Sequence, residues 1–308
     1  MTSEVQVTAD GQGDFPTIQA AIDEAPLGRL LRIGLAPGIY REKIVIPASK
    51  TVELHGQDVM STTITWDDYA TKAHREGGLY GTLRTPTMWV EADDVIIENV
   101  SIENSATPRS LVGQAVALAL RGRRCQVLNA RLLGHQDTLY VGGEGPHYFK
   151  LVEISGDVDY IFGPAPTLFE DCRLISLGQG YITAASTPKD EEVGYVFWHC
   201  HLAASGDFRT YLGRPWRPYA SVTWIETEMG AHIAPEGWDN WRDPANQETA
   251  RYAEFGSSGP GGGARERVSW AKTSPHLEEL PDQLHLATLR RRWGFGPKDE
   301  REGGGLYV

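Results

Sequence analysis

Two aspartates in otherwise apolar segments are the residues of this sequence best suited to chemistry. Asp137 lies in the segment GHQDTLY (134–140), and Asp159 follows 22 residues later in GDVDYIFG (156–163). In a fold that repeats once per such interval, both would lie on adjacent strands, about 4.8 Å apart. Like charges at that range resist double ionisation, so one carboxyl group should stay ionised while the other holds a proton. One member of such a pair could act as a nucleophile and the other as a general acid. The same two carboxyl groups could equally catalyse glycoside hydrolysis.

Two glutamines and an arginine favour acyl chemistry for this pair. Gln114 lies 23 residues before Asp137, and Gln136 directly precedes it. Their neutral amides are donors suited to an oxyanion that develops on an ester carbonyl. Arg214, in the segment LGRPW, is a permanent cation that could hold one aspartate ionised and aimed as a nucleophile. Buried Asp and Gln can equally serve turns and stacked polar ladders, and that structural alternative stays open.

Short strands at a regular interval must position these residues. Five segments read apolar–polar–apolar, with two inward positions that flank one outward position, and 227–229 (Thr-Glu-Met) is a looser sixth member. They recur at intervals of 30, 22, 20, 28 and 27 residues: 100–102, 130–132, 152–154, 172–174, 200–202 and 227–229. That interval suits one coil of a β-solenoid and is too short for a βαβ unit. A β-sandwich, whose strands also alternate, is the alternative.

One amphipathic helix is predicted near the N-terminus. Residues 17–25 (TIQAAIDEA) stand between Pro16 and Pro26, and their apolar side chains share one face. A short helix at this place could cap the open end of a stack of coils.

Composition narrows the classes of function. The 308 residues carry a net charge of −12, which disfavours nucleic-acid binding, and the basic run 290–292 is interpreted as a solvated face. No run of eighteen apolar residues exists, so no membrane span is expected. The N-terminus shows no secretory leader, so the chain as written is expected in the cytoplasm. No second domain is evident, and residues 1–308 are predicted to form a single domain.

The cysteines and glycines do not indicate a metal or cofactor site. Cys125, Cys172 and Cys200 are too few for a disulfide scaffold, although a stacked Cys172–Cys200 pair is possible. The histidines that flank Cys200 face the opposite way in a strand, so the three cannot converge on zinc. The Gly-rich run 256–263 is followed by Ala-Arg rather than Lys-Ser/Thr, which indicates a surface loop.

Several segments in order along the chain resemble the pectin methylesterase (pectinesterase) family. GQAVAL, GHQDTLYV, GDVDYIFG and LGRPW look like its four signature segments, in the right order and spacing. GDFPTIQAAID and PGIYREKIVIP look like its N-terminal region, and ITAAS, GWDNW and GPGGGARERVSW look like later segments. The resemblance implies an all-β, right-handed parallel β-helix of the pectin-lyase type and a reaction without metal or cofactor.

The resemblance also implies a role for each matched residue. Asp159 would attack the C6 methyl ester carbonyl, and Asp137 would protonate departing methanol and then activate water. Gln114 and Gln136 would stabilise the oxyanion, and Arg214 would hydrogen-bond to Asp159. The expected substrate contacts are Trp216, Trp238, Tyr160 and Thr87.

The sequence departs from the family pattern beside the predicted nucleophile. Asp157 stands where the family often has Thr or Ser, and His135 stands where an aromatic residue is common. Residues 157 and 159 share a face if their strand is regular. We therefore expect the extra carboxylate to raise the pKa of its neighbour and to move activity to higher pH.

Three other functions remain open at this point. They are an esterase or thioesterase for another acyl group, a lyase or glycosidase on the same scaffold, and a non-catalytic carbohydrate-binding β-helix. The expected partner is pectin or methylated oligogalacturonates, bound by a monomer, with no nucleic acid and no membrane. The net charge of −12 predicts repulsion from de-esterified pectin.

Overall fold

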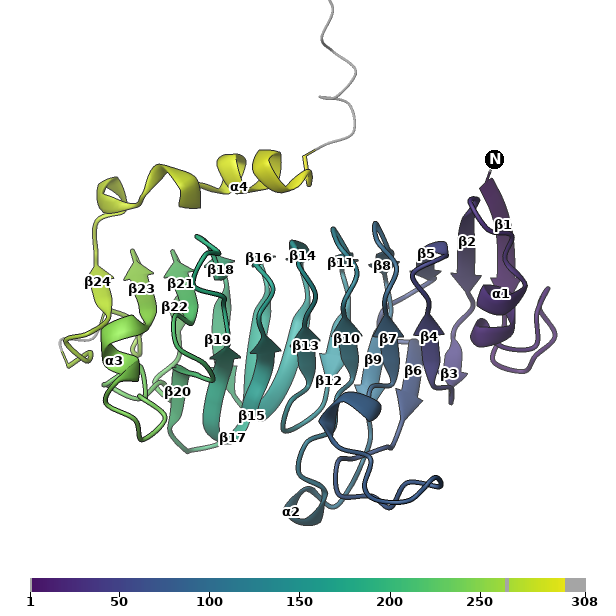
Figure 1. The fold of residues 1–308 in the computed structure, drawn as a ribbon, viewed down its shortest axis with the longest axis horizontal. Helices are drawn as coiled ribbons and strands as arrows, with labels where there is room; N and C mark the ends of the chain where they lie inside the picture. Colours follow the sequence, from purple (N-terminus) through teal and green to yellow (C-terminus); the bar gives the residue numbers. More distant parts are fainter. Residues whose placement is uncertain (1, 264–265, 297–308) are drawn as a thin grey trace, which may run out of the picture.

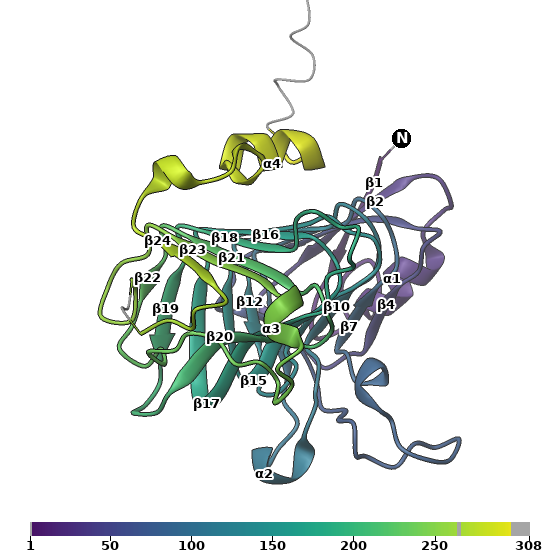
Figure 2. The ribbon, with the colours of Figure 1, turned by 60° about the vertical axis from the view of Figure 1, so that its left-hand side comes forward.

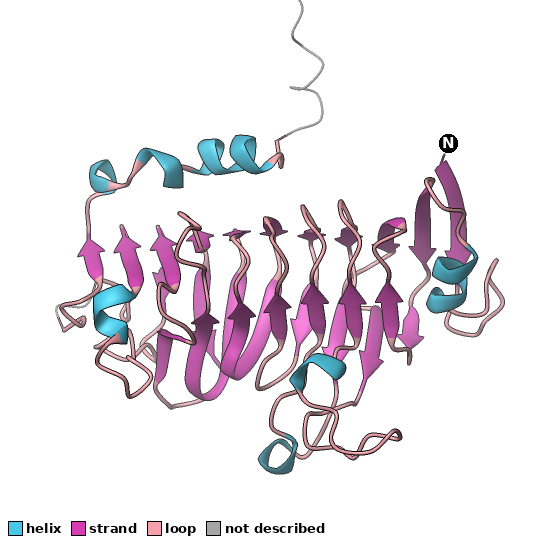
Figure 3. Ribbon diagram, viewed as in Figure 1, coloured by secondary structure: helices cyan, strands magenta, loops and turns pink. Residues whose placement is uncertain are grey.

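Parallel strands stacked into one long coil make up most of the structure (Figure 1; Figure 3). The computed structural model describes residues 2–263 and 266–296. Within these residues the strands form an 11-stranded and a 13-stranded sheet, and neighbouring strands run parallel. The predicted parallel β-helix is therefore confirmed. The end of the predicted domain, 297–308, and the Ala-Arg pair after the Gly-rich run lie outside the described residues.

The 11-stranded sheet forms one side of the coil. Its strands, in spatial order, are β1 (Thr2–Val7), β2 (Leu30–Leu35), β5 (Thr51–Gly56), β8 (Ile96–Glu98), β11 (Gln126–Leu128), β14 (His147–Lys150), β16 (Thr167–Glu170), β18 (Tyr195–Trp198), β21 (Ser221–Ile225), β23 (Arg251–Phe255) and β24 (Lys272–Ser274).

The 13-stranded sheet bends to form the other two sides. One side holds β3 (Gly38–Tyr40), β6 (Thr62–Trp66), β9 (Ser101–Asn104), β12 (Arg131–Leu133), β19 (His201–Ala204) and β22 (Glu228–Met229). The other holds β4 (Ile44–Ile46), β7 (Met88–Val90), β10 (Leu118–Leu120), β13 (Leu139–Val141) and β20 (Thr210–Pro215). Two long strands, β15 (Glu153–Gly163) and β17 (Arg173–Ala185), pair with both sides.

The six repeats predicted from the sequence stack in register. Their outward positions pair one above another, in the order Ser101, Arg131, Glu153, Arg173, His201 and Glu228. Their flanking inward positions are all buried. The coil turns sharply just before each repeat through one residue with positive φ, such as Asn99 and Asn129, whose side chains hydrogen-bond at 2.7 Å. The interval between repeats is therefore the length of one coil.

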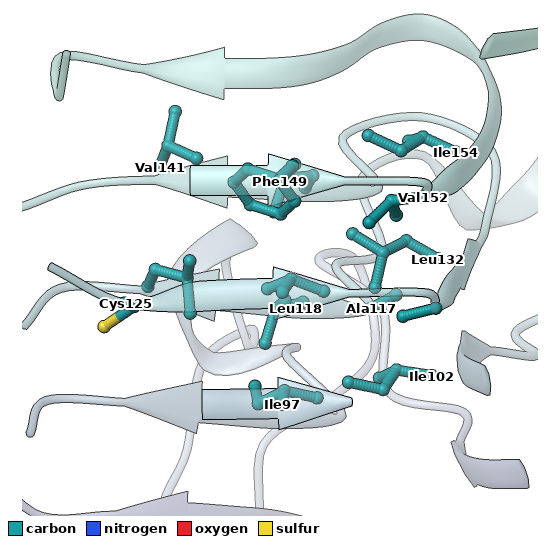
Figure 4. Close-up of a cluster of buried hydrophobic side chains, with 14 of the residues drawn as sticks. Ile97, Ile102, Ala117, Leu118, Cys125, Leu132, Val141, Phe149, Val152 and Ile154 are labelled. Carbon is teal, nitrogen blue, oxygen red and sulfur yellow. The ribbon is translucent and has the colours of Figure 1, made fainter. Parts of the chain in front are cut away.

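The interior of the coil is filled by ladders of like side chains. Figure 4 shows part of this core, where Phe149 of β14 lies among aliphatic side chains from several coils. Phe149, Phe169, Phe197 and Trp224 continue as one aromatic stack, with successive ring centroids 4.9, 4.4 and 3.8 Å apart. Such stacking stabilises each coil through its neighbours, because a single coil cannot bury its own face.

The cysteines belong to this interior. All three thiols are free and buried, so the possible Cys172–Cys200 disulfide is not formed. The Sγ of Cys200 contacts the backbone oxygen of Phe169 at 3.6 Å, while His199 points to Glu226 at 2.7 Å. The described residues contain no group of three or more His, Cys, Asp or Glu side chains placed to hold a metal ion.

The predicted capping helix is α1 (Ile18–Glu24), next to the first coils. Thr17 caps it by accepting a hydrogen bond from the backbone N–H of Ala20 at 3.1 Å, and Ile18, Ala21 and Ile22 are buried. Two further short helices are α2 (Arg109–Val112) and α3 (Asn246–Thr249). None of the described helices has the length and apolar composition needed to cross a lipid bilayer.

A C-terminal segment crosses the outer side of the 11-stranded sheet (Figure 2). It comprises the 3-10 helices η2 (Leu277–Glu279) and η3 (Asp282–Leu284) and the helix α4 (Leu286–Trp293). Arg290 forms a two-point ion pair with buried Glu170 of β16. The interpretation of residues 290–292 as a solvated face is therefore wrong for Arg290, which holds this segment to the coil.

Candidate active site

A ladder of outward-facing residues forms the floor of a groove along the β4–β20 side. Register places its members on successive strands: Val45, Trp89, Ala119, Tyr140, Phe162, Ala184 and Arg214. Asp137 and Asp159 lie just before the β13 and β15 members of this ladder. Extending the Leu139–Ile161 pairing back by two residues puts these aspartates side by side on adjacent coils, one coil apart as their spacing predicts.

Arg214 forms a bidentate salt bridge with Asp159. Oδ1 of Asp159 accepts a hydrogen bond from Nε at 2.9 Å, and its Oδ2 accepts one from Nη2 at 2.7 Å. The Asp159 residue is only 6% exposed, and burial raises its pKa above the ordinary value, while the Arg214 guanidinium opposes that rise. A planar, two-point contact of this kind fixes the direction of the carboxylate as well as its charge.

Arg214 is itself fixed between two aromatic rings. Its guanidinium carbon lies 3.8 Å from the ring centroid of Tyr181 and 3.7 Å from that of Trp241. Gly213, next to it, is required by close packing, because an added Cβ would stand 2.0 Å from Thr183 Oγ1. The LGRPW segment thus positions one cation with little freedom to move.

Asp137 has a different environment from Asp159. It is 8% exposed, and no hydrogen bond from a described side chain reaches its carboxyl group. Burial raises the pKa of Asp137 well above its usual value, and the charges of Asp159 and Asp157 add to the rise, with only Arg214 opposing it. Of the two carboxyl groups, Asp137 is therefore the one whose surroundings favour the protonated form more, while the Arg214 guanidinium favours the carboxylate form of Asp159.

Gln114 and Gln136 lie side by side on adjacent coils, and Gln136 is on the same coil as Asp137. A parallel bridge joins them, and the N–H of Ala115 donates to the carbonyl oxygen of Gln136 at 3.1 Å. Both side chains are half-buried and line the same cavity as the two aspartates. Two amide donors thus lie beside the carboxylate pair, where a carbonyl oxygen of a bound ester could accept from them.

These groups open into one cleft of about 430 Å³. Its lining consists of Thr82, Leu83, Gln114, Gln136, Asp137, Asp159, Phe162, Ala184, Arg214, Trp216 and Trp241. The structure thus brings all five predicted catalytic residues together, and it places Trp216 in the wall. Trp216 packs edge-on against Phe162, with centroids 6.0 Å apart, so one wall of the cleft is aromatic.

Comparison with known proteins identifies the family. The family model described as Pectinesterase matches residues 4–283. The chain belongs to the pectinesterase family. Its sequence is 40% identical to Pectinesterase 31 of Arabidopsis thaliana over 280 residues, which cover 88% of this chain and 87% of that protein.

Solved structures of pectin methylesterases have the same fold. The enzyme from carrot superposes with a TM-score of 0.86 at 25% identity, covering 99% of this chain and 97% of that one. A pectin methylesterase in complex with a hexasaccharide superposes with a TM-score of 0.78 at 26% identity, covering 92% and 97% of the two chains.

Three predicted substrate contacts are wrong for this member of the family. Tyr160 is fully buried and its hydroxyl group lies 3.3 Å from that of Ser176. Thr87 is also fully buried, and its hydroxyl group donates to the backbone oxygen of Glu103 at 2.8 Å. Trp238 pairs with Gly213 on an inward-facing rung and stacks on Tyr252, with centroids 4.2 Å apart. None of the three lines the cleft.

Two aromatic residues of the cleft, Trp241 and Phe162, were not predicted from the sequence, and neither was Tyr181, which packs against Arg214. GWDNW contains two tryptophans three residues apart, and the second one, Trp241, reaches the cleft and covers Arg214. Phe162 could have been found from the sequence, because it lies one coil after Tyr140 in the same outward ladder. No pattern in the sequence marks Tyr181 as a neighbour of Arg214.

The predicted rise in the pKa of Asp159 next to Asp157 is wrong, because the charge of Asp157 acts on Asp137 instead. Register shifts interrupt β15 between Gly156 and Ile161, and Asp159 has a φ of 52°, so Asp157 and Asp159 do not share a face. Asp157 is 2% exposed, and its Oδ2 lies 3.1 Å from Nδ1 of His135, behind Gln136. Its charge contributes to the raised pKa of Asp137, after burial and the charge of Asp159.

Proposed function

We propose that this chain hydrolyses the C6 methyl esters of galacturonate units in pectin or its oligomers, releasing methanol. The unequal pair of carboxyl groups carries the proposal. One is chelated by Arg214 and the other is buried without a cation of its own, and both lie beside two amide donors. Ester hydrolysis by an acyl-enzyme route needs these three elements: a carboxylate nucleophile, a proton donor and an oxyanion site.

In the first step the Asp159 carboxylate oxygen attacks the ester carbonyl carbon. The negative charge that develops on the carbonyl oxygen is stabilised by the amide N–H groups of Gln114 and Gln136. The C–OCH₃ bond then breaks, and Asp137 gives its proton to the leaving oxygen, so methanol departs. An acyl-enzyme anhydride on Asp159 remains, and Asp137 is now ionised.

In the second step water completes the reaction. Asp137 takes a proton from a water molecule, whose oxygen attacks the acyl carbon of the intermediate. The bond to Asp159 breaks, a free galacturonate carboxyl group is released, and Asp159 returns to its carboxylate form. Arg214 stays bound to Asp159 throughout and favours its departure as a carboxylate.

The cleft suits a carbohydrate ester better than a compact apolar acyl group. Trp216 and Trp241 present aromatic surface next to the two aspartates, and sugar rings pack against such surface. A second cavity shares Leu83 with the cleft, so the hollow surface extends along the coil, which suits a polymer. A related structure holds a hexasaccharide, as its title states.

Methanol release from highly methylated pectin tests this function. We expect release by the wild type and a loss of at least about 10³-fold in Asp159→Asn, which keeps the size of the side chain but removes the nucleophile. Asp207→Asn is the matched control, because Asp207 is exposed and lies outside the cleft. It should release methanol at the wild-type rate.

Two results would contradict the proposal. Wild-type activity in Asp159→Asn would remove Asp159 from the chemistry. A folded wild type that releases no methanol, yet hydrolyses an acyl thioester in an Asp159-dependent way, would keep the site and replace the substrate.

A further inference from the structure

His135 and Asp157 form a polar contact directly behind the catalytic cleft. They lie 22 residues apart on adjacent coils, and both are positions at which the sequence departs from the family pattern. Nδ1 of His135 lies 3.1 Å from Oδ2 of Asp157, a residue that is 2% exposed. Because a carboxylate oxygen can only accept, Nδ1 of the imidazole carries the hydrogen of this contact. The contact therefore joins one coil to the next beside the catalytic residues.

The Asp157 carboxylate also binds the backbone that leads to the proposed nucleophile. Its Oδ1 accepts a hydrogen bond from the N–H of Val158 at 2.7 Å, and the carbonyl oxygen of Val158 accepts one from the N–H of Asp137 at 3.1 Å. The N–H of Asp157 in turn donates to the carbonyl oxygen of His135 at 3.2 Å. These contacts form a closed ring that contains Gln136, since Gln136 joins His135 to Asp137 in the chain.

The backbone inside this ring needs such support. Asp137 has a φ of 65° and Asp159 has a φ of 52°. Both values lie in the left-handed region, which a residue with a side chain keeps only where its surroundings hold it there. The pairing of β15 with β17 is also interrupted between Gly156 and Ile161. Regular strand pairing is therefore incomplete where Asp159 lies, and side-chain contacts must add to it.

The packing behind Gln136 is also incomplete. A cavity of about 110 Å³ lies there, and His135, Asp157 and Asn104 are among the residues that line it. Gln136 lines both this cavity and the catalytic cleft, so it forms part of the wall between them. A residue with space on two sides is not fixed by close packing alone. The direction of its amide therefore depends on the hydrogen bonds that hold its neighbours.

We propose that His135 is a positioning residue for the esterase reaction. Acting through Asp157, it holds in place the turn that carries Gln136 and Asp137. The role rests on the proposed function, because it concerns the residues that would act on the bound ester. An oxyanion donor stabilises the transition state more than the bound substrate, so a less well held Gln136 should lower kcat and leave KM nearly unchanged.

Methanol release by two variants of His135 tests the proposal. His135→Phe removes the donor, and we expect kcat to fall about ten-fold with KM nearly unchanged. His135→Asn places an amide N–H close to the position of Nδ1, so it should retain most of the wild-type kcat. The control is His276→Phe, which changes an exposed histidine outside the cleft and should match the wild type.

A double-mutant cycle tests whether His135 acts through Asp157. Asp157→Thr removes the carboxylate that accepts from His135. Each kcat is taken at the optimum pH of that variant, because the charge of Asp157 also acts on Asp137. We expect His135→Phe to cost little more in the Asp157→Thr chain, since the contact is already lost there. An equal loss in both chains would overturn the proposed route through Asp157.

Hydrogen exchange of the folded protein tests the same contact without turnover. The backbone N–H groups of Asp137 and Asp157 donate across the two turns. Peptides that contain them should exchange about ten-fold faster in His135→Phe than in the wild type, and His135→Asn should resemble the wild type. Unchanged exchange in His135→Phe, or a wild-type kcat, would overturn the proposal. A wild type that releases no methanol would instead remove the proposed function, and the exchange measurement would still decide whether His135 holds the turn.

Discussion

At the residue scale, Asp137 and Asp159 show how two buried carboxyl groups in one cleft can have different electrostatic surroundings. Burial raises the pKa of both, and the bidentate contact with Arg214 limits the rise at Asp159. Asp137 has no such contact and also lies near the charges of Asp159 and Asp157. The proposed mechanism uses this difference, with Asp159 as the carboxylate and Asp137 as the protonated acid. That is the combination needed for attack on an ester and protonation of the leaving group.

The pH profile of Asp157→Asn tests this division. The alkaline limb of kcat/KM should report loss of the proton from Asp137 in the free enzyme. Because the negative charge of Asp157 helps to keep that proton in place, its removal should lower the pKa of Asp137 and move the alkaline limb to lower pH. Asp207→Asn should leave the profile unchanged. An alkaline limb that does not move in Asp157→Asn would show that Asp157 does not act on the acid.

The sequence predicted which polar residues line the cleft better than it predicted which aromatic residues do. Asp137, Asp159 and Gln136 lie in segments whose polar residues interrupt apolar strands, so their exceptional position was visible in the sequence. Trp238 and Trp241 are three residues apart in an irregular segment, and only the fold decides which one faces the cleft. Tyr160 turns inward because Asp159 adopts a φ of 52°, which breaks the alternation assumed for a regular strand.

At the element scale, one buried asparagine attaches the loop between β6 and β7 to the coil. Asn104 donates from its amide nitrogen to the backbone oxygens of Asp68 at 2.9 Å, Thr85 at 3.3 Å and Val116 at 3.0 Å. This loop supplies Thr82 and Leu83 to the rim of the cleft. In Figure 1 the loops that follow β6 and β9 project from the stack near α2.

Asn104→Ala should therefore affect both stability and activity. It leaves buried carbonyl oxygens without their partner, so we expect a loss of about 2–3 kcal/mol in the free energy of unfolding. A lower kcat/KM should accompany it, because the rim of the cleft loses its support. Denaturant unfolding and methanol release measure the two effects, with exposed Gln247→Ala as control. A variant as stable and active as the wild type would show that this loop is held by other contacts.

The coil could be predicted from the sequence, but this loop could not. The repeats have a definite period, and their outward positions pair in the predicted order from Ser101 to Glu228. The loop between β6 and β7 has no period of its own, and contacts such as that of Asn104 with Asp68 join residues 36 positions apart. Such contacts leave no local pattern in the sequence.

At the scale of the whole molecule, a charged cluster around Glu170 adds to the apolar packing that attaches the C-terminal segment to the coil. Glu170 accepts hydrogen bonds from Tyr148 at 2.8 Å and Lys150 at 2.9 Å, in addition to its ion pair with Arg290. Burial works to raise the pKa of Glu170, but these partners prevail and the pKa lies below its usual value. These contacts add to the free energy of unfolding. Their contribution is fully present above the pKa that Glu170 has in the unfolded chain, and it is lost as the pH falls through the pKa of Glu170 in the folded protein.

Arg290→Met should lower the free energy of unfolding by about 2 kcal/mol at neutral pH, because a hydrogen-bonded contact between charges is lost. The difference from the wild type should shrink in acid, where Glu170 becomes protonated. Thermal unfolding at several pH values measures this, and the neighbouring Arg291→Met, which removes an exposed arginine, is the control. Equal stability of both variants would show that apolar packing alone holds the segment. Arg290 and Glu170 are 120 positions apart, so no sequence pattern predicted their contact.

In the proposed mechanism, Asp159 is a covalent nucleophile and carries the acyl group between the two steps. Rapid quenching of the wild type with a short methylated oligogalacturonate, followed by mass analysis of its peptides, would detect an acyl group on that residue. We predict a mass increase equal to the substrate minus methanol on the peptide that contains Asp159, and none in Asp159→Asn. Methanol formed at the wild-type rate by Asp159→Asn, or an adduct on another residue, would contradict the account.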